Sequence, residues 1–502
     1  MSHYMLFAIL GLFAMTQCQE YDVIVVGSGL AGLGAGKYFH DNNVSKFLIL
    51  EANDYIGGRV KNIHWHNLTI PLGAGWLHMV DEDHEIYKKH LQYNMSLYTD
   101  TYWLNKVEFR NGNDGSIISS EEVGKVNNRI VAAQDKMDEL VEQRVENGQG
   151  TIDLKSGLRW GGFEAKTPLE NAIEYFRYEF ENGIEPDVID AVGFGYSALN
   201  ENVHERIVND PRGYGFPVFE ESKPYQSKIK LNKTATKITM HSKNNITIEC
   251  KDGTSYTTKN VLVTVSTGVV QSGNIKFSPK LPEWKTGGLN MAPMCHYCKI
   301  FLRFNTVFWD DSKSYVMLAT ERKGHFVHWE NMNADGLFPG SKILLATLTG
   351  DICRESYTYT DNEIIEQAYQ VLKKVYPNAT RPIEMKRNDF SINPNFLGSY
   401  SYQIAGINEN DYKAMDHPVQ QSIYFAGEAY QRWEFGYAHG AYDSGLGAAK
   451  NITNCMRDEE KCATDSPKFD YPNQQIPSHA VRITMSLEML LTVFVTTLFK
   501  LI

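Results

Sequence analysis

Residues 21–53, YDVIVVGSGLAGLGAGKYFHDNNVSKFLILEAN, constrain the fold of this chain more than any other segment. They open with a β-branched apolar run, typical of a strand buried on both faces of a parallel sheet. Gly27, Gly29 and Gly32 then give the G-x-G-x-x-G spacing, and a helix is predicted from Leu30 to about Asp41. This order predicts an α/β domain with a Rossmann-like dinucleotide site.

Each part of this unit has a physical task. The first glycine permits a tight turn, the second lets the backbone approach a pyrophosphate, and the third lets the helix pack on the strand. The start of the helix directs N–H groups and a positive dipole end at phosphates. A second strand ends at Glu51, nineteen positions after Gly32, where a carboxylate can accept hydrogen bonds from an adenosine ribose.

The segment after Glu51, EANDYIGGRV, indicates which dinucleotide binds. Gly57, Gly58 and Arg59 lie directly behind the acid, and an ordinary glycine turn is one interpretation. A glycine pair and an arginine can also continue along a longer cofactor, with the guanidinium meeting its pyrophosphate. This pattern favours FAD over NAD.

Length and charge narrow the remaining choices. A chain of 502 residues is too long for one ordinary core, so two or more domains are expected. The net charge of −11 argues against nucleic acid as a partner, because no basic excess is available to neutralise phosphates. An acidic chain is compatible with a cationic partner.

The two ends of the chain carry targeting patterns. Residues 1–18 contain an apolar stretch of signal-peptide length, with a buried N-terminal strand as the alternative. Residues 465–480 predict a linker, and residues 481–502 are apolar. Small residues near Ser478 followed by that tail resemble a GPI-attachment signal, with a packed amphipathic helix as the alternative.

Glycosylation sequons support secretion or display at the cell surface. Seven asparagines occur in N-x-[ST] triplets: Asn43, Asn67, Asn94, Asn232, Asn245, Asn378 and Asn451. The protein would then contact a membrane only through the C-terminal lipid anchor.

Six cysteines remain once Cys18 leaves with the signal peptide. Cys455 and Cys462 flank a short charged segment and could close a small loop. Cys295 and Cys298 have CxxC spacing, but they lie in a segment that predicts a strand, where residues three apart point to opposite faces. We therefore expect two buried free thiols there, and no redox or metal site.

Further motifs give the chain a family resemblance. The segment from Glu51 to Val60 resembles the signature of the flavin-containing amine oxidases. Other family segments follow in order: PLGAGWLH at 71–78, VLVTVSTGVVQSG at 261–273, CKIFLRF at 298–304 and YFAGEAYQRWEFGYAHGAYDSGLGAA at 424–449. The resemblance extends from about Tyr21 to Cys462 and is strongest to polyamine oxidases, especially secreted plant-type ones.

The resemblance implies two interleaved domains. A Rossmann-like FAD-binding domain would comprise residues 21–96, 223–283 and 388–464, and a substrate domain with a mixed sheet and helices would comprise residues 97–222 and 284–387. Two sequence patterns agree with this division. Short strands with turn signals are predicted within 228–265, and charged residues with helical apolar spacing predict a helix over 121–147.

The resemblance also implies a reaction. FAD, held non-covalently because no cysteine lies beside the C-terminal flavin segment, would oxidise a polyamine next to a secondary amine. The imine would hydrolyse to an aldehyde and an amine, and O2 would become H2O2. Lys299 would be catalytic, holding a water near the flavin, while Tyr400 and Tyr437 would form an aromatic sandwich for the substrate.

Other residues would contact the cofactor. Glu428 would meet its ribityl–phosphate part, and the helix near 439–449 would direct its N-terminus at the flavin. The full expected set of cofactor contacts is Gly27, Gly29, Gly32, Glu51, Arg59, Gly73, Ala74, Gly75, Trp76, Ala235, Phe390, Glu428 and Tyr437. Phe390 replaces the tryptophan often found in the family.

His78 departs from the plant-type pattern. Plant-type enzymes carry an acid there and a second acid after RGY, where this chain has Gly215. A histidine can hydrogen-bond a substrate nitrogen without adding negative charge. The loss of both acids leaves the polyamine preference open.

Two other classes of function stay open. One is a different flavin amine oxidase, acting on an L-amino acid or a monoamine. An L-amino acid oxidase would need an arginine facing the substrate carboxylate, for which Arg177, Arg303 and Arg322 are candidates. The other class is a non-catalytic surface protein with a flavoprotein fold, although Lys299, Glu51 and Glu428 argue for an enzyme.

Overall fold

The computed structural model describes residues 20–80, 84–100, 107–147, 149–191, 204–432 and 434–469. Up to Pro467 these residues belong to one compact unit. The predicted signal peptide and apolar tail, and most of the predicted linker, lie outside the described residues. Within the described part, no helix combines the length and apolar character that a membrane crossing requires.

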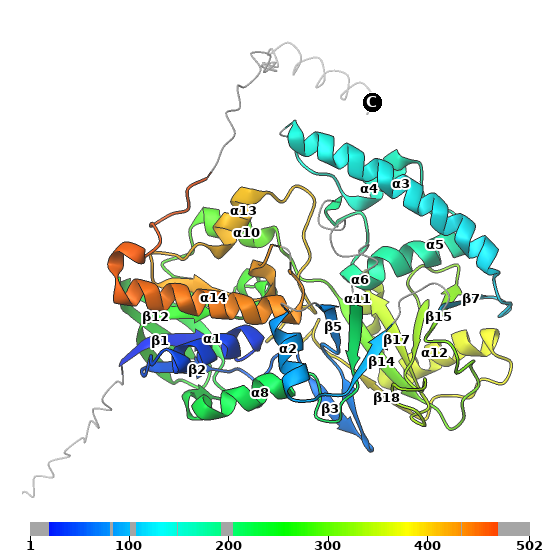
Figure 1. Cartoon of the computed structure of the whole chain (residues 1–502), viewed down its shortest axis with the longest axis horizontal. Helices are drawn as coiled ribbons and strands as arrows, with labels where there is room; N and C mark the ends of the chain where they lie inside the picture. The colour runs from blue at the N-terminus through cyan, green and yellow to red at the C-terminus, as the bar shows by residue number, and fades with distance from the viewer. Residues whose placement is uncertain are drawn as a thin grey trace, which may run out of the picture. The chain divides into compact units, whose positions relative to one another are not determined.

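An eight-stranded sheet forms around β1 and β2, the two strands of the segment 21–53 (Figure 1). Its strands run in the order β13-β10-β11-β12-β1-β2-β9, and β19 pairs with β12. Their bounds are β1 Glu20–Val26, β2 Phe47–Leu50, β9 Ile229–Lys230, β10 Ala235–Ser242, β11 Asn245–Cys250, β12 Ser255–Val263, β13 Lys276–Ser278 and β19 Ile423–Phe425.

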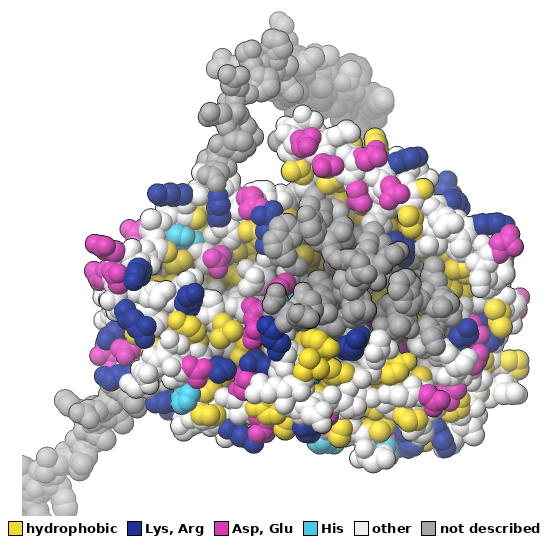
Figure 2. Space-filling view, in the orientation of Figure 1, with side chains coloured by type: hydrophobic (Ala, Val, Ile, Leu, Met, Phe, Trp, Pro, Cys, Tyr) yellow, Lys and Arg dark blue, Asp and Glu magenta, His cyan; other side chains and the backbone are white. Residues whose placement is uncertain are grey.

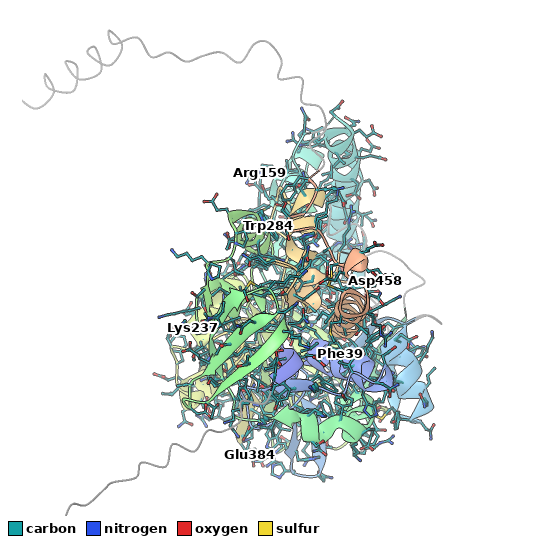
Figure 3. The ribbon with its side chains drawn as sticks, turned by 90° about the vertical axis from the view of Figure 1, so that its left-hand side faces the viewer. Phe39, Arg159, Lys237, Trp284, Glu384 and Asp458 are labelled. Atoms are coloured by element: carbon teal, nitrogen blue, oxygen red, sulfur yellow. A yellow bond between two sulfur atoms is a disulfide. The ribbon has the colours of Figure 1, made fainter. Side chains whose placement is uncertain are left out.

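Strand β1 lies between two cores, as its β-branched run predicts. It pairs in parallel with β2 and β12. Val23 and Val25 pack with Phe39 of α1 (Leu30–Asp41), which Figure 3 labels. Alternate residues Ile24 and Val26 pack on the opposite face. The strand is therefore buried on both faces, which fixes the position of the glycine turn that follows it.

Helices α1 and α14 (Ala438–Arg457) cross closely over this sheet (Figure 1). The crossing depends on glycine. A Cβ on Gly445 would lie 2.0 Å from the Ala31 carbonyl oxygen, and one on Gly34 would lie 2.7 Å from that of Tyr442. The close approach brings the N-terminus of α14, which follows Tyr437, to the same side of the sheet as the start of α1.

A second, six-stranded sheet has the order β18-β14-β17-β16-β15-β7. Its strands are β7 Val107–Asn111, β14 Tyr297–Arg303, β15 Tyr315–Ala319, β16 His328–Asn331, β17 Ile343–Thr349 and β18 Glu384–Arg387. One face packs Ile300 and Leu302 against α12 (Asp361–Val375). Lys299 alternates with these residues, so it points to the opposite face.

Two smaller sheets complete the strands. One pairs β3 (Asn62–Trp65) with β4 (Leu68–Pro71). The other has the order β5-β8-β6, formed by Trp76–Val80, His204–Val208 and Leu97–Asp100. This three-stranded sheet joins β5, from the predicted FAD-binding domain, to β6 and β8, from the predicted substrate domain. The interleaved division of the chain stays a prediction.

Helices cover the six-stranded sheet on the side of α3 (Figure 1). The predicted helix over 121–147 is α3, Ser120–Glu146, which begins with a capping box between Ser119 and Glu122. Its buried stripe packs on α4, and acidic side chains gather over this region in Figure 2. The remaining α-helices are α2 Glu85–Gln92, α4 Leu154–Gly161, α5 Pro168–Glu174, α6 Phe180–Asn182, α8 Phe216–Ser222, α9 Thr267–Gln271, α10 Glu283–Asn290, α11 Gly350–Ser356 and α13 Glu409–Asp416.

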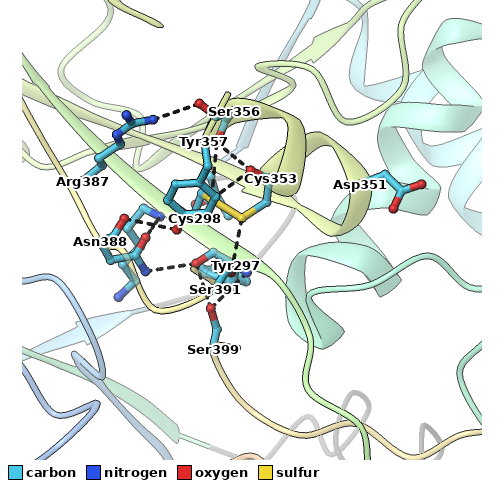
Figure 4. The surroundings of a disulfide bond; sticks show 12 residues. Tyr297, Cys298, Asp351, Cys353, Ser356, Tyr357, Arg387, Asn388, Ser391 and Ser399 are labelled. Atoms are coloured by element: carbon cyan, nitrogen blue, oxygen red, sulfur yellow. Dashed lines mark hydrogen bonds between the residues drawn. A yellow bond between two sulfur atoms is a disulfide. The ribbon is translucent and has the colours of Figure 1, made fainter. Parts of the chain in front are cut away.

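The prediction that Cys298 is a free thiol is wrong. Cys298 forms a disulfide with Cys353 at a Cα–Cα distance of 5.5 Å (Figure 4). Its side chain points away from Lys299 toward α11, where Cys353 lies. Cys295 is buried and free, so the two CxxC thiols do separate to different environments, and Cys250 is also free. A second disulfide joins Cys455 to Cys462.

Candidate active site

The turn after β1 has the geometry of a dinucleotide cradle. Gly27 has a φ of +111°, and a Cβ on Gly32 would lie 2.0 Å from the Gly27 carbonyl oxygen, so both positions need glycine. A Cβ on Gly29 would meet nothing within 4 Å. The start of α1 therefore faces open space, where backbone N–H groups can approach a phosphate.

Glu51 lies at the carboxyl end of β2 beside this turn. One of its oxygens accepts hydrogen bonds from the Ser28 backbone N–H and hydroxyl, both at 2.7 Å. The other accepts from the Asn53 backbone N–H and side-chain amide, at 2.8 and 2.7 Å. These bonds hold the buried carboxylate in the place where a ribose hydroxyl would reach it.

Arg59 pairs with Glu428, which lies 369 positions further along the chain. Its guanidinium donates to a Glu428 oxygen at 2.8 Å and to the Ser399 carbonyl at 2.9 Å. Glu428 also accepts from both the backbone and the hydroxyl of Ser401, and from the Gly436 N–H at 3.1 Å. The two charges predicted to contact the cofactor thus form one network that ties the N- and C-terminal motifs together.

Lys299 lies under the second glycine-rich segment. Its Nζ donates to the Gly73 carbonyl at 2.7 Å and lies 4.2 Å from the centre of the Trp76 ring. A Cβ on Gly73 would lie 1.7 Å from the Arg59 carbonyl oxygen, so this segment must approach Arg59 without a side chain. The structure therefore brings Lys299, Gly73, Trp76 and Arg59 together.

Burial sets the charge state of Lys299. The lysine is 5 % exposed, and burial lowers its pKa to about 7, while the charge of Glu330 on β16 opposes the shift. Lys299, Thr347 and His328 face each other across three neighbouring strands, and Glu330 lies two residues beyond His328 on the same face. A lysine in this setting can gain or lose a proton near neutral pH.

Tyr400 and Tyr437 are tied together by one acid, Glu181. The Tyr437 hydroxyl donates to a carboxylate oxygen of Glu181 at 2.9 Å, and the Tyr400 hydroxyl donates to the Glu181 carbonyl at 2.6 Å. The Tyr297 ring lies 5.7 Å from that of Tyr400. Glu181 belongs to α6, directly after a π-helical turn at Tyr175–Glu179, a feature frequent at functional sites.

His78 faces the same aromatic pair from β5. Its ring centre lies 4.9 Å from that of Tyr437, and its Nδ1 forms an ion pair with Glu205 of β8 at 2.7 Å. Burial alone would lower the pKa of His78, but the charges of Glu205 and Glu181 raise it to about 9. At neutral pH His78 therefore carries a proton and adds no negative charge to the site.

Phe390 and Ala235 are buried, and Gly215 is closely packed. Phe390 is buried with its ring edge-on to Phe396, at 5.3 Å. Ala235 is buried at the start of β10. A Cβ on Gly215 would lie 2.3 Å from the Phe219 ring, so no acid fits at this position without displacing Phe219.

Glu181, Glu205 and Glu330 are the site residues that sequence reasoning missed. Glu181 stands in YEFENG, where alternating acids give no sign of which one points inward. Glu205 lies on β8, which pairs with β5, the strand of His78. This pairing joins segments more than 120 residues apart in the sequence. The acids lost at His78 and Gly215 are thus present from other elements.

Two protein families match this chain. Residues 194–453, just over half of the chain, match the family of flavin containing amine oxidoreductases, and residues 25–90 match the NAD(P)-binding Rossmann-like domain. The solved structure of a putrescine oxidase triple mutant, from a redesign of cofactor binding, is similar with a TM-score of 0.68 at 16% identity. It covers 87% of this chain and 99% of that chain, which shows the fold.

Curated relatives agree with the family match. Polyamine oxidase 1 of Zea mays is 26% identical over 462 residues, 87% of this chain and 91% of that protein. Polyamine oxidase 4 of Oryza sativa subsp. japonica is 28% identical over 446 residues, 85% of this chain and 87% of that protein. The chain belongs to the family of flavin-containing amine oxidoreductases and is an FAD-dependent amine oxidase.

Proposed function

We propose that this enzyme oxidises a polyamine at a carbon next to a secondary amine and reduces O2 to H2O2. The observation that carries the proposal is the pair of tyrosines joined through Glu181, with the His78–Glu205 pair beside Tyr437. Aromatic faces attract cations and align methylene chains, while carboxylates attract ammonium groups. The names of the curated relatives support the same substrate class.

The residues present fit FAD. The open face at Gly29, the close contact at Gly32 and the fixed carboxylate of Glu51 suit the adenosine and pyrophosphate, and the Arg59–Glu428 network would hold the flavin half. When bound, FAD supplies the acceptor for a hydride equivalent from the amine and passes the electrons to O2. The oxidised amine is an imine, and water splits it into an aldehyde and an amine.

This chain's residues bind the amine and manage its protons. The tyrosines would orient the methylene chain, so that one nitrogen reaches the site near Lys299. The substrate nitrogen must lose a proton before oxidation. Because the pKa of Lys299 is about 7, its side chain can hold a water or exchange a proton during imine hydrolysis at neutral pH.

The amino-acid alternative has less support in the structure. Such an enzyme needs an arginine facing a carboxylate substrate. Arg177 donates to Asn127 and Gln134, Arg303 to Glu384, and Arg322 to Glu355. All three candidate guanidinium groups are thus engaged by side chains of the chain itself.

Replacing Tyr437 by alanine tests the proposed substrate site. We expect the rate of flavin reduction by spermidine to fall about two- to thirtyfold, because a cation–π contact contributes about 0.5–2 kcal/mol. Tyr437→Phe keeps the ring and loses the bond to Glu181, so its rate should lie between those of the alanine variant and the wild type. Both rates are measured by stopped-flow absorbance, with FAD content as the control. A rate that falls only in proportion to lost FAD would contradict a substrate role.

We expect the FAD to be held non-covalently. Cys455 and Cys462 are the cysteines nearest in sequence to the C-terminal flavin segment. They are joined to each other in a disulfide and leave no thiol there for a flavin linkage. Acid precipitation of the yellow protein should therefore release all flavin into the supernatant. Flavin that stays with the pellet would refute this prediction.

We also propose that the enzyme is a secreted or surface-bound glycoprotein. All seven sequon asparagines are exposed, and the two disulfides suit an oxidising compartment. Peptide N-glycosidase should lower the apparent mass of protein expressed in animal or plant cells, and phospholipase should release it if the tail directs a lipid anchor near Ser478. An unchanged mass after glycosidase treatment would contradict glycosylation, and release of full-length protein with its tail intact would contradict the anchor.

A further inference from the structure

The His78–Glu205 ion pair is built at an irregularity in the β5–β8 pairing. Leu77 pairs with Arg206, and the register shifts before Val80. Such irregularities re-aim side chains and are frequent next to active sites. The two side chains are 25% and 19% exposed, so the pair is shielded but still within reach of a solute.

The titratable groups that act on His78 belong to several elements. Glu205 on β8 and Glu181 on α6 attract a proton to it, while Lys299 on β14 repels one. His439 on α14 also stacks on the Tyr437 ring, and burial together with the charges of His84 and His78 lowers its pKa to about 3. His439 is therefore neutral, and Glu205 is the principal counter-charge of the His78 imidazolium.

A substrate ammonium would compete with His78 for Glu205. Once an ammonium neutralises Glu205, only the smaller attraction of Glu181 for the imidazole proton remains, while burial, the largest effect, and Lys299 still disfavour the imidazolium. His78 then gives its proton to the solvent, so the net charge of the subsite is the same before and after binding. The imidazolium thus holds the place of a ligand cation in the empty site.

We propose that Glu205 is the subsite for a second ammonium group of the substrate, with His78 as its resident cation, so that binding of a diamine or polyamine expels the His78 proton. This inference rests on the proposed polyamine function. It assigns Glu205 to one ammonium group of the polyamine and predicts that the His78 proton is released on binding. A monoamine has no second ammonium and would leave the pair intact.

Calorimetry on the FAD-loaded enzyme, reduced beforehand under argon so that no turnover occurs, tests the proposal. Spermidine is titrated at pH 7.5 in buffers of different ionisation enthalpy, which gives the number of protons released. We expect the wild type to release close to one proton more than His78→Gln, because a group with a pKa of about 9 is almost fully protonated at this pH. Butylamine should give the same count for both proteins.

His66→Gln is the matched control. His66 forms an ion pair of the same type with Glu384 at 2.7 Å, and Glu384 lies at the lower edge of the view in Figure 3. This variant should release as many protons as the wild type. Glu205→Gln should weaken spermidine binding by at least about tenfold while changing butylamine binding much less. If Glu205→Gln does not fold, the proton release measured for the His78 and His66 variants tests the proposal.

The outcomes separate this inference from the proposed function. Equal proton release by the wild type and His78→Gln would overturn the subsite, even if spermidine is a good substrate. Failure of the wild type to bind spermidine, spermine or their N-acetyl forms would overturn both. Equal weakening of spermidine and butylamine binding in Glu205→Gln would also overturn the assignment of Glu205 to a second ammonium.

Discussion

Replacement of Lys299 by methionine is expected to leave FAD bound while slowing flavin reduction or reoxidation by at least about tenfold, about 1.4 kcal/mol in barrier. Methionine keeps an unbranched buried side chain over Trp76 but removes the charge and the donor to Gly73. Stopped-flow absorbance under argon, followed by mixing with O2, measures the two half-reactions separately.

The pH dependence gives this prediction a second readout. Burial holds the pKa of Lys299 at about 7, so the side chain is protonated below that pH and neutral above it. A wild-type inflection near pH 7 in the affected half-reaction should therefore disappear in Lys299→Met. Glu330 and the His78 pair also face this lysine, so Glu330→Gln should move the inflection to lower pH. Unchanged rates and an unchanged pH profile in Lys299→Met would remove the lysine from the mechanism.

Replacement of Glu428 by alanine should have the largest effect on stability. It leaves the Arg59 guanidinium without its carboxylate and removes the acceptor of Ser401 and Gly436. Removal of one partner of a buried pair costs about 3–5 kcal/mol, and we expect the lower part of that range because Arg59 is 22% exposed. Urea denaturation should show this loss, and FAD content should fall with it.

An exposed ion pair provides the control for Glu428. Glu121 pairs with Lys125, and both side chains are more than two-thirds exposed. Glu121→Ala should change the free energy of unfolding by less than about 1 kcal/mol, as is usual for surface pairs. A Glu428 variant that is as stable and as yellow as the Glu121 variant would show that the network does not hold the two motifs together.

The cofactor half of the site could be predicted because its signals are local. The turn from Gly27 to Gly32 and the acid at Glu51 belong to one strand–helix–strand unit, and the helix formed over the predicted residues, Leu30–Asp41. The alternation of side chains along a strand likewise predicts that Lys299 and its neighbour Cys298 point to opposite faces of β14. It could not reveal that Cys298 meets Cys353, because that contact depends on the packing of α11 against β14.

The acids of the substrate site were not predictable in the same way. Glu181 acts through hydroxyl groups of tyrosines that lie more than 200 positions away, and Glu205 acts through a strand pairing. Neither has a spacing that distinguishes it from the other acids of the chain. The loss of acids at His78 and Gly215 therefore left the polyamine preference open, whereas the fold supplies carboxylates from α6 and β8.

Anaerobic reduction of the bound flavin tests the central claim most directly. The holoenzyme is mixed under argon with spermine, spermidine, their N-acetyl forms and several L-amino acids, and the loss of flavin absorbance is followed for each. We expect rapid bleaching by at least one polyamine and little by any amino acid. Rapid bleaching by L-amino acids with none by any polyamine would contradict the proposed substrate class. A flavin that no amine reduces would contradict the conclusion that the protein is an amine oxidase.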